Sequence, residues 1–463
     1  MRILSYLSLL TLLLLASCRS APTPNAANNI HNGIPWFDDQ GETVNAHGAC
    51  LVKEGGKYYL FGEYKSNSVN AFFGFSCYSS DNLVDWKFER IVLGVQPKGI
   101  LGPNRIGERV KVMKCPATGE YVMYMHCDDM KYNDPYIGYA TCSTINGEYT
   151  FRGPLLHDGQ PIRRWDMGTF QDTDGTGYLL IHHGIIYRLS NDYRSAEVKV
   201  LEKLKGSGES PAMMKKDGLY YLLYSNLTSW ERNDNYYYTA SRVEGPWTSQ
   251  GLFCPEGSLT YNSQCSFIFP LVQGHDTTYI YMGDRWSFPN QSDAATQVWL
   301  PLQADREKLS IPQYWETWNL VTIQPTHPLA GTMSIGQDNI KLYAPGDWTI
   351  KNNLLTSNVP GSYIEATFTG KRFAIAGESN SRSGYARITI ADNRGKIVHE
   401  SLVDFYSKVP NKGVRFASPR LSKGEYTVKV TVTGIVPEWF KKNGERLGSS
   451  GCFVTVSDVV VYQ

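Results

Sequence analysis

The chain has little net charge and a modest number of charged residues. Its 463 residues carry 45 Lys and Arg against 44 Asp and Glu, which gives a net charge of +1, and only 19% of its residues are charged. Proteins that bind nucleic acid need clusters of basic residues for the phosphates, so we expect no nucleic-acid partner. Hydrophobic residues make up 42% of the chain, which indicates a globular protein with a sizeable core rather than a disordered one.

Long hydrophobic segments are also absent. The one sustained apolar run, residues 7–16, is too short to cross a bilayer as a helix and is typical of a signal peptide. The sequence Leu15-Ala16-Ser17-Cys18 is similar to a bacterial lipobox, with an ordinary signal peptide as the alternative. We therefore expect a signal peptide over 1–17, lipidation of Cys18 and a polar tether over 18–30. The protein would then lie in a bacterial cell envelope, at the periplasmic face of the outer membrane, with the lipid as its only membrane contact.

The other eight cysteines form no Cys-x-x-Cys pair and show no metal-ligand spacing. Most of them lie in apolar runs, so we expect free buried thiols. His126, Asp128 and Asp129 match no standard set of metal ligands. The segment Asp172-Thr173-Asp174 begins like a calcium loop but lacks the later ligands. We expect no metal site and no required cofactor, and a structural calcium ion is the alternative left open.

Aromatic residues and glycine are what the chain has in abundance, with 30 Tyr, 11 Trp and 42 Gly. Aromatic side chains favour strands and glycine favours turns, so the composition predicts an all-β fold. Five similar segments begin at residues 47, 108, 166, 209 and 264, each with a strand, a hairpin turn and an aromatic second strand. Units of about 45–60 residues with about four strands are typical of propeller blades. We therefore predict a five-bladed β-propeller over 31–325.

Residues 331–463 have a different pattern. Short runs of alternating hydrophobicity, such as SYIEATFTG and KGEYTVKVTVTG, are separated by turn residues. This pattern predicts a C-terminal β-sandwich of the jelly-roll type. A stabilising accessory domain and a carbohydrate-binding domain are both compatible with such a fold.

The predicted propeller brings the opening residues of its five units together at one end of the central channel. Burial of several carboxylates in one place is costly unless they are paired or have a chemical task. A channel closed by salt bridges is the structural alternative, since Arg105, Arg109, Arg163 and Arg164 are close to two of these residues in the sequence. The five opening residues are His47, Glu108, Asp166, Glu209 and Gln264.

Several runs resemble glycoside hydrolase family 43, in particular its exo-β-1,3-galactanase and galactosidase branches. They include NAHGACLVKEGGKYYLFGEYK, GERVKVMKCPATGEYVMYMH, ESPAMMKKDGLYYLLYSNLTSW and LTYNSQCSF. The resemblance covers about 45–320. It implies a glycosidase with a plant-type oligosaccharide or polysaccharide as its substrate.

The chain departs from the usual family pattern in three places. Most of the family has an Asp general base on the first inner strand, whereas this strand reads VNAHGACL and has no carboxylate. The galactanase-like branch shares that absence. This branch usually has Ser-Arg-Asp at Arg164-Trp165-Asp166 and Glu-Ala-Pro at Glu209-Ser210-Pro211.

The resemblance implies an inverting mechanism, in which one group protonates the leaving oxygen and another activates a water on the opposite face of the sugar. Glu209 matches the family's acid, and we expect Asp166 to raise its pKa and to orient it. Gln264 matches the branch's unusual amide, and we expect it to position the water, with Glu108 as the carboxylate alternative for the base.

Sugar recognition needs polar groups for the hydroxyls and an aromatic platform for the apolar face of the ring. Glu63 matches a sugar-binding Glu of the branch. The other candidates could equally be core or rim residues. The expected sugar-binding residues are His47, Glu63, Tyr124, Asn226, Trp230 and Trp286.

The leading hypothesis is a monomeric, lipid-anchored exo-glycosidase that releases galactose from β-1,3-linked galactan or arabinogalactan. An α-L-arabinofuranosidase or β-xylosidase of the same fold is the first alternative, and the missing Asp on the first strand argues against it. A non-catalytic glycan-binding lipoprotein is the second. Sugar binding alone does not need Glu108, Asp166 and Glu209 together, which argues against this reading.

Overall fold

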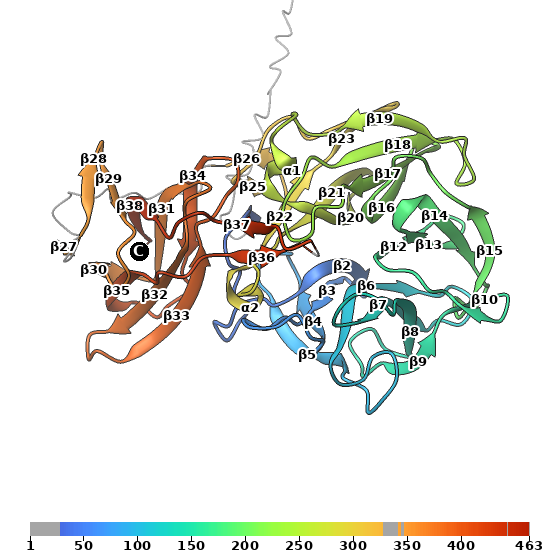
Figure 1. The fold of residues 1–463 in the computed structure, drawn as a ribbon, viewed down its shortest axis with the longest axis horizontal. Helices are drawn as coiled ribbons and strands as arrows, with labels where there is room; N and C mark the ends of the chain where they lie inside the picture. The colour runs from blue at the N-terminus through green and yellow to red at the C-terminus, as the bar shows by residue number, and fades with distance from the viewer. Residues whose placement is uncertain (1–27, 327–340, 344–346, 442, 463) are drawn as a thin grey trace, which may run out of the picture.

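The computed structural model describes residues 28–326, 341–343, 347–441 and 443–462 (Figure 1). The described chain is built of strands, with only short helical turns such as α1 (Leu259–Asn262) and α2 (Gln291–Ala294). The all-β prediction is therefore confirmed. The expected signal peptide, the lipidation site Cys18 and most of the tether lie outside the described residues.

Five mainly antiparallel sheets follow one another in the N-terminal part of the described chain, coloured blue to yellow in Figure 1. Their strands run in sequence order, with the fourth strand missing from the last sheet. The first two sheets are β2 (His47–Glu54), β3 (Lys57–Glu63), β4 (Gly74–Ser80), β5 (Lys87–Gly94), and β6 (Arg105–Lys114), β7 (Tyr121–Asp129), β8 (Tyr136–Cys142), β9 (Thr150–Pro154).

The next three sheets have the same plan. The third is β12 (Met167–Gln171), β13 (Gly177–Ile181), β14 (Ile185–Leu189) and β15 (Ala196–Leu201), with β10 (Leu156–His157) and β11 (Gln160–Pro161) at its outer edge. The fourth is β16 (Glu209–Lys216), β17 (Leu219–Ser225), β18 (Tyr236–Ala240) and β19 (Thr248–Leu252). The fifth is β20 (Gln264–Gln273), β21 (Asp276–Arg285) and β22 (Thr296–Pro301).

The first strands of the five sheets contact one another in sequence order. β2 contacts β6, β6 contacts β12, β12 contacts β16, β16 contacts β20, and β20 contacts β2. Side chains bridge neighbouring strands, as where the Lys111 ammonium donates to the Gly48 carbonyl at 2.8 Å and the Ser266 hydroxyl to the Ala49 carbonyl at 2.9 Å. The strand ends that carry the predicted site residues are thereby brought together.

Smaller elements join the two ends of the N-terminal part. β1 (Asn29–His31) pairs with β25 (Thr317–Asn319), which also pairs with β26 (Gln324–Pro325). A hairpin of β23 (Gln303–Asp305) and β24 (Lys308–Ser310) follows the fifth sheet. The Asn32 amide donates to the Trp299 carbonyl at 3.0 Å, which ties the segment after β1 to β22.

The C-terminal part, orange to red in Figure 1, has two five-stranded sheets. Buried residues of both sheets, including Phe373, Ile388 and Val456, form one hydrophobic cluster. A short hairpin of β36 (Glu438–Phe440) and β37 (Arg446–Gly448) precedes the last strand. In spatial order the sheets are β27 (Lys341–Tyr343), β30 (Tyr363–Gly370), β35 (Gly424–Val432), β32 (Tyr385–Asp392), β33 (Ile397–Asp404), and β28 (Thr349–Lys351), β29 (Leu354–Ser357), β38 (Val454–Tyr462), β31 (Arg372–Ser379), β34 (Asn411–Ala417).

The eight cysteines within the described ranges are free thiols, as the sequence predicted, and six of them are buried. Over the same ranges no three His, Cys, Asp or Glu side chains gather as a metal site would require. Asp172 instead pairs with the Lys215 ammonium at 2.8 Å, and Gln171 pairs with Gly177 across a hairpin. No helix of the described chain is long and apolar enough to cross a membrane.

Tyr124 is not a sugar-binding residue, and the prediction that it contacts substrate was wrong. Its side chain is fully buried in a hydrophobic cluster that also contains Leu179 and Ile181 of the third sheet. Its hydroxyl donates to the Tyr193 carbonyl at 2.6 Å. Tyr124 comes two residues before His126 in β7 and pairs with Lys111, whereas His126 pairs with Glu108. Tyr124 is therefore farther from the strand ends that form the site.

We therefore expect Tyr124→Phe to lower the free energy of unfolding by about 1 kcal/mol, because one buried hydrogen bond is lost. Tyr124→Ala should cost more, because a cavity is added. Urea unfolding followed by tryptophan fluorescence measures both. Equal stability of the wild type and the Phe variant would contradict the buried contact to Tyr193.

Candidate active site

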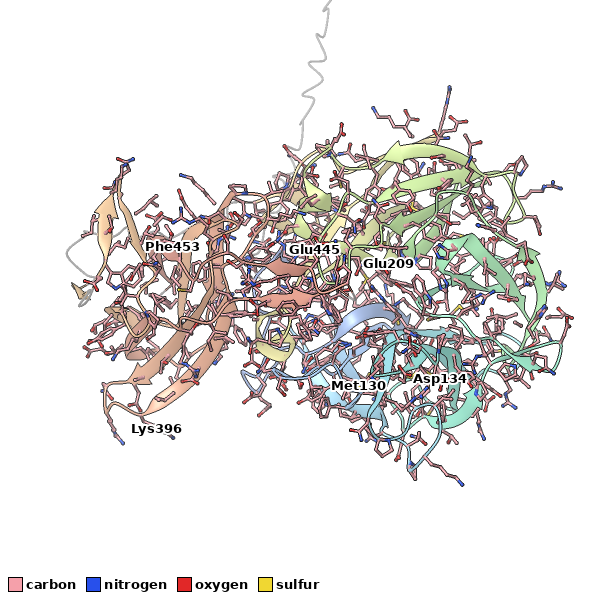
Figure 2. The ribbon with its side chains drawn as sticks, viewed as in Figure 1. Met130, Asp134, Glu209, Lys396, Glu445 and Phe453 are labelled. Carbon is pink, nitrogen blue, oxygen red and sulfur yellow. The ribbon has the colours of Figure 1, made fainter. Side chains whose placement is uncertain are left out.

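The opening residues of the five units converge through the first strands. His47, Glu209 and Gln264 begin β2, β16 and β20, Glu108 lies in β6, and Asp166 directly precedes β12. Glu209 lies on β16 where this strand approaches β20 (Figure 2). Strands that contact one another in order bring these side chains from distant parts of the sequence into one site.

A second set of site residues comes from the second strand of the hairpin in four of the five units. The residue that faces an opening residue across the hairpin lies at the same strand end, because antiparallel pairing places the two opposite each other. The pairs are His47 with Glu63, Glu108 with His126, Glu209 with Ser225, and Gln264 with Asp284.

The residue after an opening residue adopts a positive φ in three of the units, and a register shift follows there. These φ angles are 55° at Gly48, 57° at Arg109 and 56° at Ser210. Such a bulge leaves a backbone N–H outside the strand ladder. Each of these three N–H groups donates to a carboxylate. Gly48 donates to Asp284 Oδ1 at 3.2 Å, Arg109 to Glu63 Oε1 at 2.8 Å, and Ser210 to Asp166 Oδ2 at 3.0 Å.

The Arg109 guanidinium connects three sheets. Its Nε lies 3.2 Å from Asp166 Oδ1, and its Nη2 donates to Gln264 Oε1 at 2.7 Å. The guanidinium also lies over the Trp286 ring, 5.5 Å from the ring centre. Burial opposes its charge, but Asp166 and Glu63 outweigh burial and raise its pKa.

Arg109 is thus the counter-ion of Asp166, in place of the arginines that are closest to it in sequence. Arg163 binds Asp134 at 2.7 Å, as Arg105 does at 2.9 Å. Arg164 donates to the carbonyl of Arg163. Arg163 and Arg164 precede β12 on the exposed side of the chain, so their closeness to Asp166 in sequence does not bring their charges to it.

Glu209 has the electrostatic setting of an acid. Desolvation by the surrounding protein and, second, the negative charge of Asp166 raise its pKa from 4.5 to about 8, although Arg109 opposes the shift. Its carboxyl is therefore protonated at neutral pH. Gln264 Nε2 donates to Glu209 Oε1 at 3.0 Å, so the proton of the neutral acid belongs on Oε2.

The Gln264 amide is held by four hydrogen bonds. Its oxygen accepts from Arg109 Nη2 at 2.7 Å and from Trp286 Nε1 at 2.8 Å. Its nitrogen donates to Glu209 Oε1 at 3.0 Å and to Ser225 Oγ at 2.9 Å. Because both donors that reach the oxygen are fixed, the amide has one favourable orientation, with its NH₂ toward Glu209.

Glu108 is held in the opposite charge state from Glu209. Burial alone would favour its neutral form, but Lys65, His126 and Asn70 lower its pKa. Its Oε1 accepts from Asn70 at 2.9 Å and from the Tyr132 hydroxyl at 2.8 Å, and its Oε2 lies 3.4 Å from His126 Nδ1. A carboxylate with a lowered pKa is a weak general base.

Lys65 joins the first two sheets at the site. Its ammonium lies 2.5 Å from Glu63 Oε2 and 3.7 Å from Glu108 Oε1. It also lies over the rings of Trp230 and Trp286, at 5.6 Å and 5.7 Å. Only 2% of Glu63 is exposed, so in this structure Glu63 contacts protein cations and N–H groups rather than solvent.

His47 and Asp284 lie beneath the site and are fully enclosed. Burial and Lys65 lower the pKa of His47 to about 3, so this imidazole is neutral. Burial raises the pKa of Asp284 to about 6 despite Arg109. The His47 ring Nδ1 lies 3.9 Å from Asp284 Oδ1.

Trp230 and Trp286 form an aromatic wall at the site. The two rings meet edge to face with centres 5.2 Å apart, and Trp230 stacks on Phe288 at 5.6 Å. Trp286 is buried, while Trp230 is partly exposed. Asn226 is exposed on the loop that follows β17, and its amide donates to the Asp234 carbonyl at 3.1 Å.

Sequence reasoning missed Lys65, Asn70, Tyr132 and Asp284, and it considered His126 only as a metal ligand. Asp284 and His126 had a usable signal, because each faces an opening residue across a hairpin. Lys65 lies two residues after the end of β3. Like Asn70 and Tyr132 it lies in a loop, where spacing in the sequence gave no signal.

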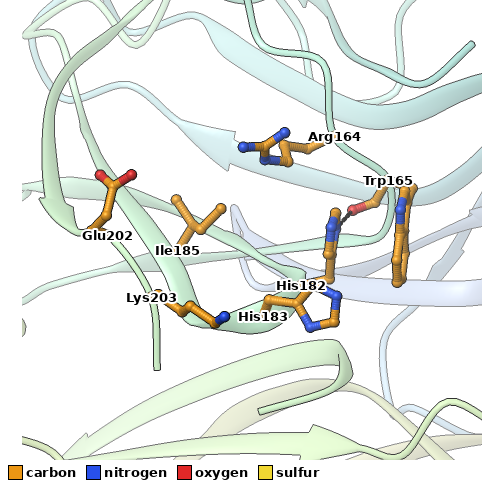
Figure 3. Close-up of a pocket in the computed structure, with 7 residues that line it drawn as sticks. All are labelled: Arg164, Trp165, His182, His183, Ile185, Glu202 and Lys203. Carbon is orange, nitrogen blue, oxygen red and sulfur yellow. Dashed lines mark hydrogen bonds between the residues drawn. The ribbon is translucent and has the colours of Figure 1, made fainter. Parts of the chain in front are cut away.

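A cavity of about 480 Å³ is lined by Trp165, the residue that precedes Asp166 in the chain (Figure 3). The Trp165 ring lies parallel to the His182 ring with centres 3.6 Å apart, and the backbone N–H of His182 donates to the Asp166 carbonyl at 3.2 Å. This packing attaches the wall of the cavity to Asp166. The lining residues are Arg164, Trp165, His182, His183, Ile185, Glu202 and Lys203.

The chain matches the model of a known protein family and is similar to several solved structures. Residues 45–264 match the model of glycosyl hydrolases family 43. The chain is 37% identical to a putative exo-β-1,3-galactanase of Bifidobacterium bifidum s17, and the alignment covers 60% of this chain and 95% of that one, with a TM-score of 0.57.

An exo-β-1,3-galactanase of Phanerochaete chrysosporium, solved with galactose, is 26% identical, and the alignment covers 94% of this chain and 100% of that one, with a TM-score of 0.66. A β-D-galactofuranosidase of Aspergillus niger is 25% identical over 214 residues, or 42% of this chain. This match spans 60% of the length of the Aspergillus protein.

The raised pKa of Glu209 predicts a pH-dependent stability. Between about pH 4.5 and 8 the folded state keeps a proton on Glu209 that the unfolded state releases, so the contribution of this group falls as pH rises. A glutamine at this position does not titrate, so in Glu209→Gln this loss of stability with rising pH is absent. The variant should gain on the order of 5 kcal/mol in unfolding free energy relative to the wild type as the pH rises from 4.5 to 8.

Denaturant unfolding at several pH values measures this difference. Glu54→Gln is the matched control, because Glu54 forms a surface pair with Lys114 at 2.7 Å, and its difference from the wild type should stay flat. A flat difference for Glu209→Gln as well would contradict the raised pKa.

Proposed function

The chain belongs to glycoside hydrolase family 43, and we propose that it is an inverting exo-glycosidase that releases galactose from β-1,3-linked galactan or arabinogalactan. The observation that carries this proposal is the effect of the Asp166 charge on the pKa of Glu209. One carboxyl has a pKa of about 8 beside a carboxylate that Arg109 keeps paired. Likeness to exo-β-1,3-galactanases supports galactose as the sugar.

Glu209 acts as the general acid. Its neutral carboxyl carries the proton on Oε2, because Oε1 accepts from Gln264, and it gives this proton to the leaving oxygen. Asp166 raises the pKa of the acid and, through the Ser210 N–H, holds the start of β16 in place. A pKa near 8 keeps most of the acid loaded at neutral pH.

Gln264 positions the water, and Glu108 binds sugar hydroxyls. An amide has little proton affinity near pH 7, so the attacking water bonds to the oxocarbenium-like carbon first and then loses its proton to bulk water. Glu209 regains its proton from solvent after the leaving group has departed. The lowered pKa of Glu108 supports its role as an acceptor, because it stays ionised at every working pH. Trp230 and Trp286 supply the aromatic platform.

The substrate extends beyond the galactose that is cleaved. A variant of the Phanerochaete enzyme was solved with β-1,3-galactotriose, at 25% identity and a TM-score of 0.67. In this chain the cavity lined by Trp165 has room for further sugar units and carries aromatic rings at one side. We place the leaving-group side of the chain there.

The proposal also covers the chain as a whole. The five N-terminal sheets would close as a five-bladed propeller over 31–325, supported by the contact of β20 with β2. The two C-terminal sheets would form a β-sandwich over 331–463, supported by their shared core. The lipid anchor at Cys18, the cell-envelope location and the absence of a required cofactor rest on the sequence pattern.

The first prediction concerns the product. In a proton NMR time course on β-1,3-galactobiose and arabinogalactan, α-galactose should appear first, because the water attacks the opposite face. Glu209→Gln should lower turnover at least about a thousandfold while the affinity for galactobiose stays within a few-fold, since the acid acts only in the transition state. Calorimetry with galactobiose measures that affinity.

Glu54→Gln again serves as the control and should keep wild-type turnover. Early β-galactose would contradict inversion. Release of arabinose or xylose would mean that the proposed galactan substrate is wrong. Binding without any product would favour a glycan-binding protein.

A second prediction concerns the cavity. Trp165→Ala removes one wall of it, so we expect KM for β-1,3-galactotriose to rise about tenfold while KM for an aryl β-galactoside changes less than twofold. Steady-state kinetics on both substrates gives the comparison. An equal change on both would place the sugar chain elsewhere.

A further inference from the structure

Two loops that carry the aromatic wall contact the C-terminal sheets. One loop runs from 226 to 235 and bears Trp230, and the other follows β21 from 286 to 290 and bears Trp286. Neither loop belongs to a strand ladder within the N-terminal sheets. Their positions therefore depend on contacts outside these ladders.

The first contact holds the loop of Trp230. The Tyr406 hydroxyl donates to Glu231 Oε2 at 2.8 Å, and the Arg232 guanidinium lies 5.5 Å from the centre of the Tyr406 ring. Glu231 and Arg232 are both buried. Arg232 in turn donates through Nη2 to the carbonyl of Trp286, so Tyr406 is linked to both loops.

The second contact holds the loop of Trp286. The Tyr385 hydroxyl donates to the Ser287 carbonyl at 3.0 Å. The Ser287 hydroxyl donates to Asp404 Oδ2 at 2.8 Å. Arg232 of the N-terminal part thus holds the carbonyl of Trp286, and Tyr385 and Asp404 of the C-terminal part hold Ser287.

A third contact comes from the β36–β37 hairpin. Figure 1 shows this hairpin reaching from the C-terminal sheets toward the N-terminal ones. The backbone N–H of Glu438 donates to the Phe288 carbonyl at 3.3 Å. Phe288 is the residue on which Trp230 stacks.

From Trp286 the connection continues to the acid. Trp286 Nε1 donates to the Gln264 oxygen at 2.8 Å, which turns the Gln264 NH₂ toward Glu209 Oε1 at 3.0 Å. Each step from Tyr406 or Tyr385 to Glu209 is a hydrogen bond or a ring contact between buried or half-buried groups. A small shift of Trp286 would release one of the two donors that fix the amide.

We propose that Tyr406 and Tyr385 of the C-terminal part are positioning residues for the active site, which hold Trp286 and thereby orient Gln264 against the acid Glu209. The C-terminal part then completes the site rather than only stabilising the chain. This inference rests on the proposed function for its kinetic consequences, whereas the structural connection to Trp286 can be tested without any substrate.

Tyr406→Phe and Tyr385→Phe are the test variants, because each removes one hydroxyl and keeps the ring. Tyr426→Phe is the matched control. Tyr426 lies on β35 of the same C-terminal sheet as Tyr385, and its hydroxyl donates to the Ser422 carbonyl at 2.8 Å, away from the N-terminal sheets. All three are made in the full chain.

The first readout is the indole N–H resonance of Trp286 in protein labelled with ¹⁵N-tryptophan, assigned with Trp286→Phe. It should shift in Tyr406→Phe and in Tyr385→Phe and stay in place in Tyr426→Phe. An unmoved resonance in both test variants overturns the proposal, even if the protein proves to have no glycosidase activity. A wild type that releases no sugar would overturn the proposed function, and the resonance alone would then decide the connection.

The second readout is kinetic. We expect about a tenfold lower kcat on galactobiose in the test variants with KM changed less than twofold, because a misplaced acid costs turnover more than binding. The Gln264 hydrogen bond lowers the pKa of Glu209, so its loss should move the alkaline limb of the pH profile to higher pH. A purely structural role would lower the unfolding midpoint and leave kcat and the pH profile at wild-type values, which would overturn the proposal. If Tyr406→Phe fails to fold, Tyr385→Phe carries the same comparison.

Discussion

The buried guanidinium of Arg109 is the contact on which the arrangement of the site depends. It pairs with Asp166, donates to Gln264 and lies over Trp286, while its backbone N–H binds Glu63. Without this cation Asp166 would be a buried carboxylate with no counter-ion, which is costly. After burial, the negative charge of Asp166 is the next largest cause of the raised pKa of Glu209, which therefore holds its proton at neutral pH.

A local backbone feature brings the carboxylates to this cation. The residue after the opening residue takes a positive φ in the first, second and fourth sheets, and its free N–H binds a carboxylate from another sheet. Each such bond both satisfies a buried acid and ties two sheets together at the site. The fold and the site are therefore stabilised by the same contacts, so substitutions at Glu63 or Asp166 affect both.

Much of this could be predicted from the sequence, because strand period and hairpin spacing are local properties. The opening residues Glu108, Asp166, Glu209 and Gln264 followed from the repeat, and the resemblance gave Glu209 its role. What failed depends on three-dimensional contacts. Tyr124 is an aromatic residue of the kind that binds sugars, but its ring is buried between two sheets. The sequence suggested Arg163 and Arg164 as partners of Asp166, whereas its partner is Arg109. Lys65 and Tyr132 lie in loops, and no short-range sequence pattern predicts the path of a loop.

The neutral amide at position 264 fits this charge arrangement better than a carboxylate would. Gln264 donates to Glu209 Oε1 and so leaves the acid's proton on the other oxygen. A carboxylate there would have no N–H to donate, and it would attract the proton of Glu209 to itself. It would also add a negative charge beside Asp166, for which Arg109 is already the partner. An amide held by Arg109 and Trp286 therefore keeps the acid loaded, and a donor from the Trp286 loop, itself bound to the C-terminal sheets, becomes part of the acid's environment.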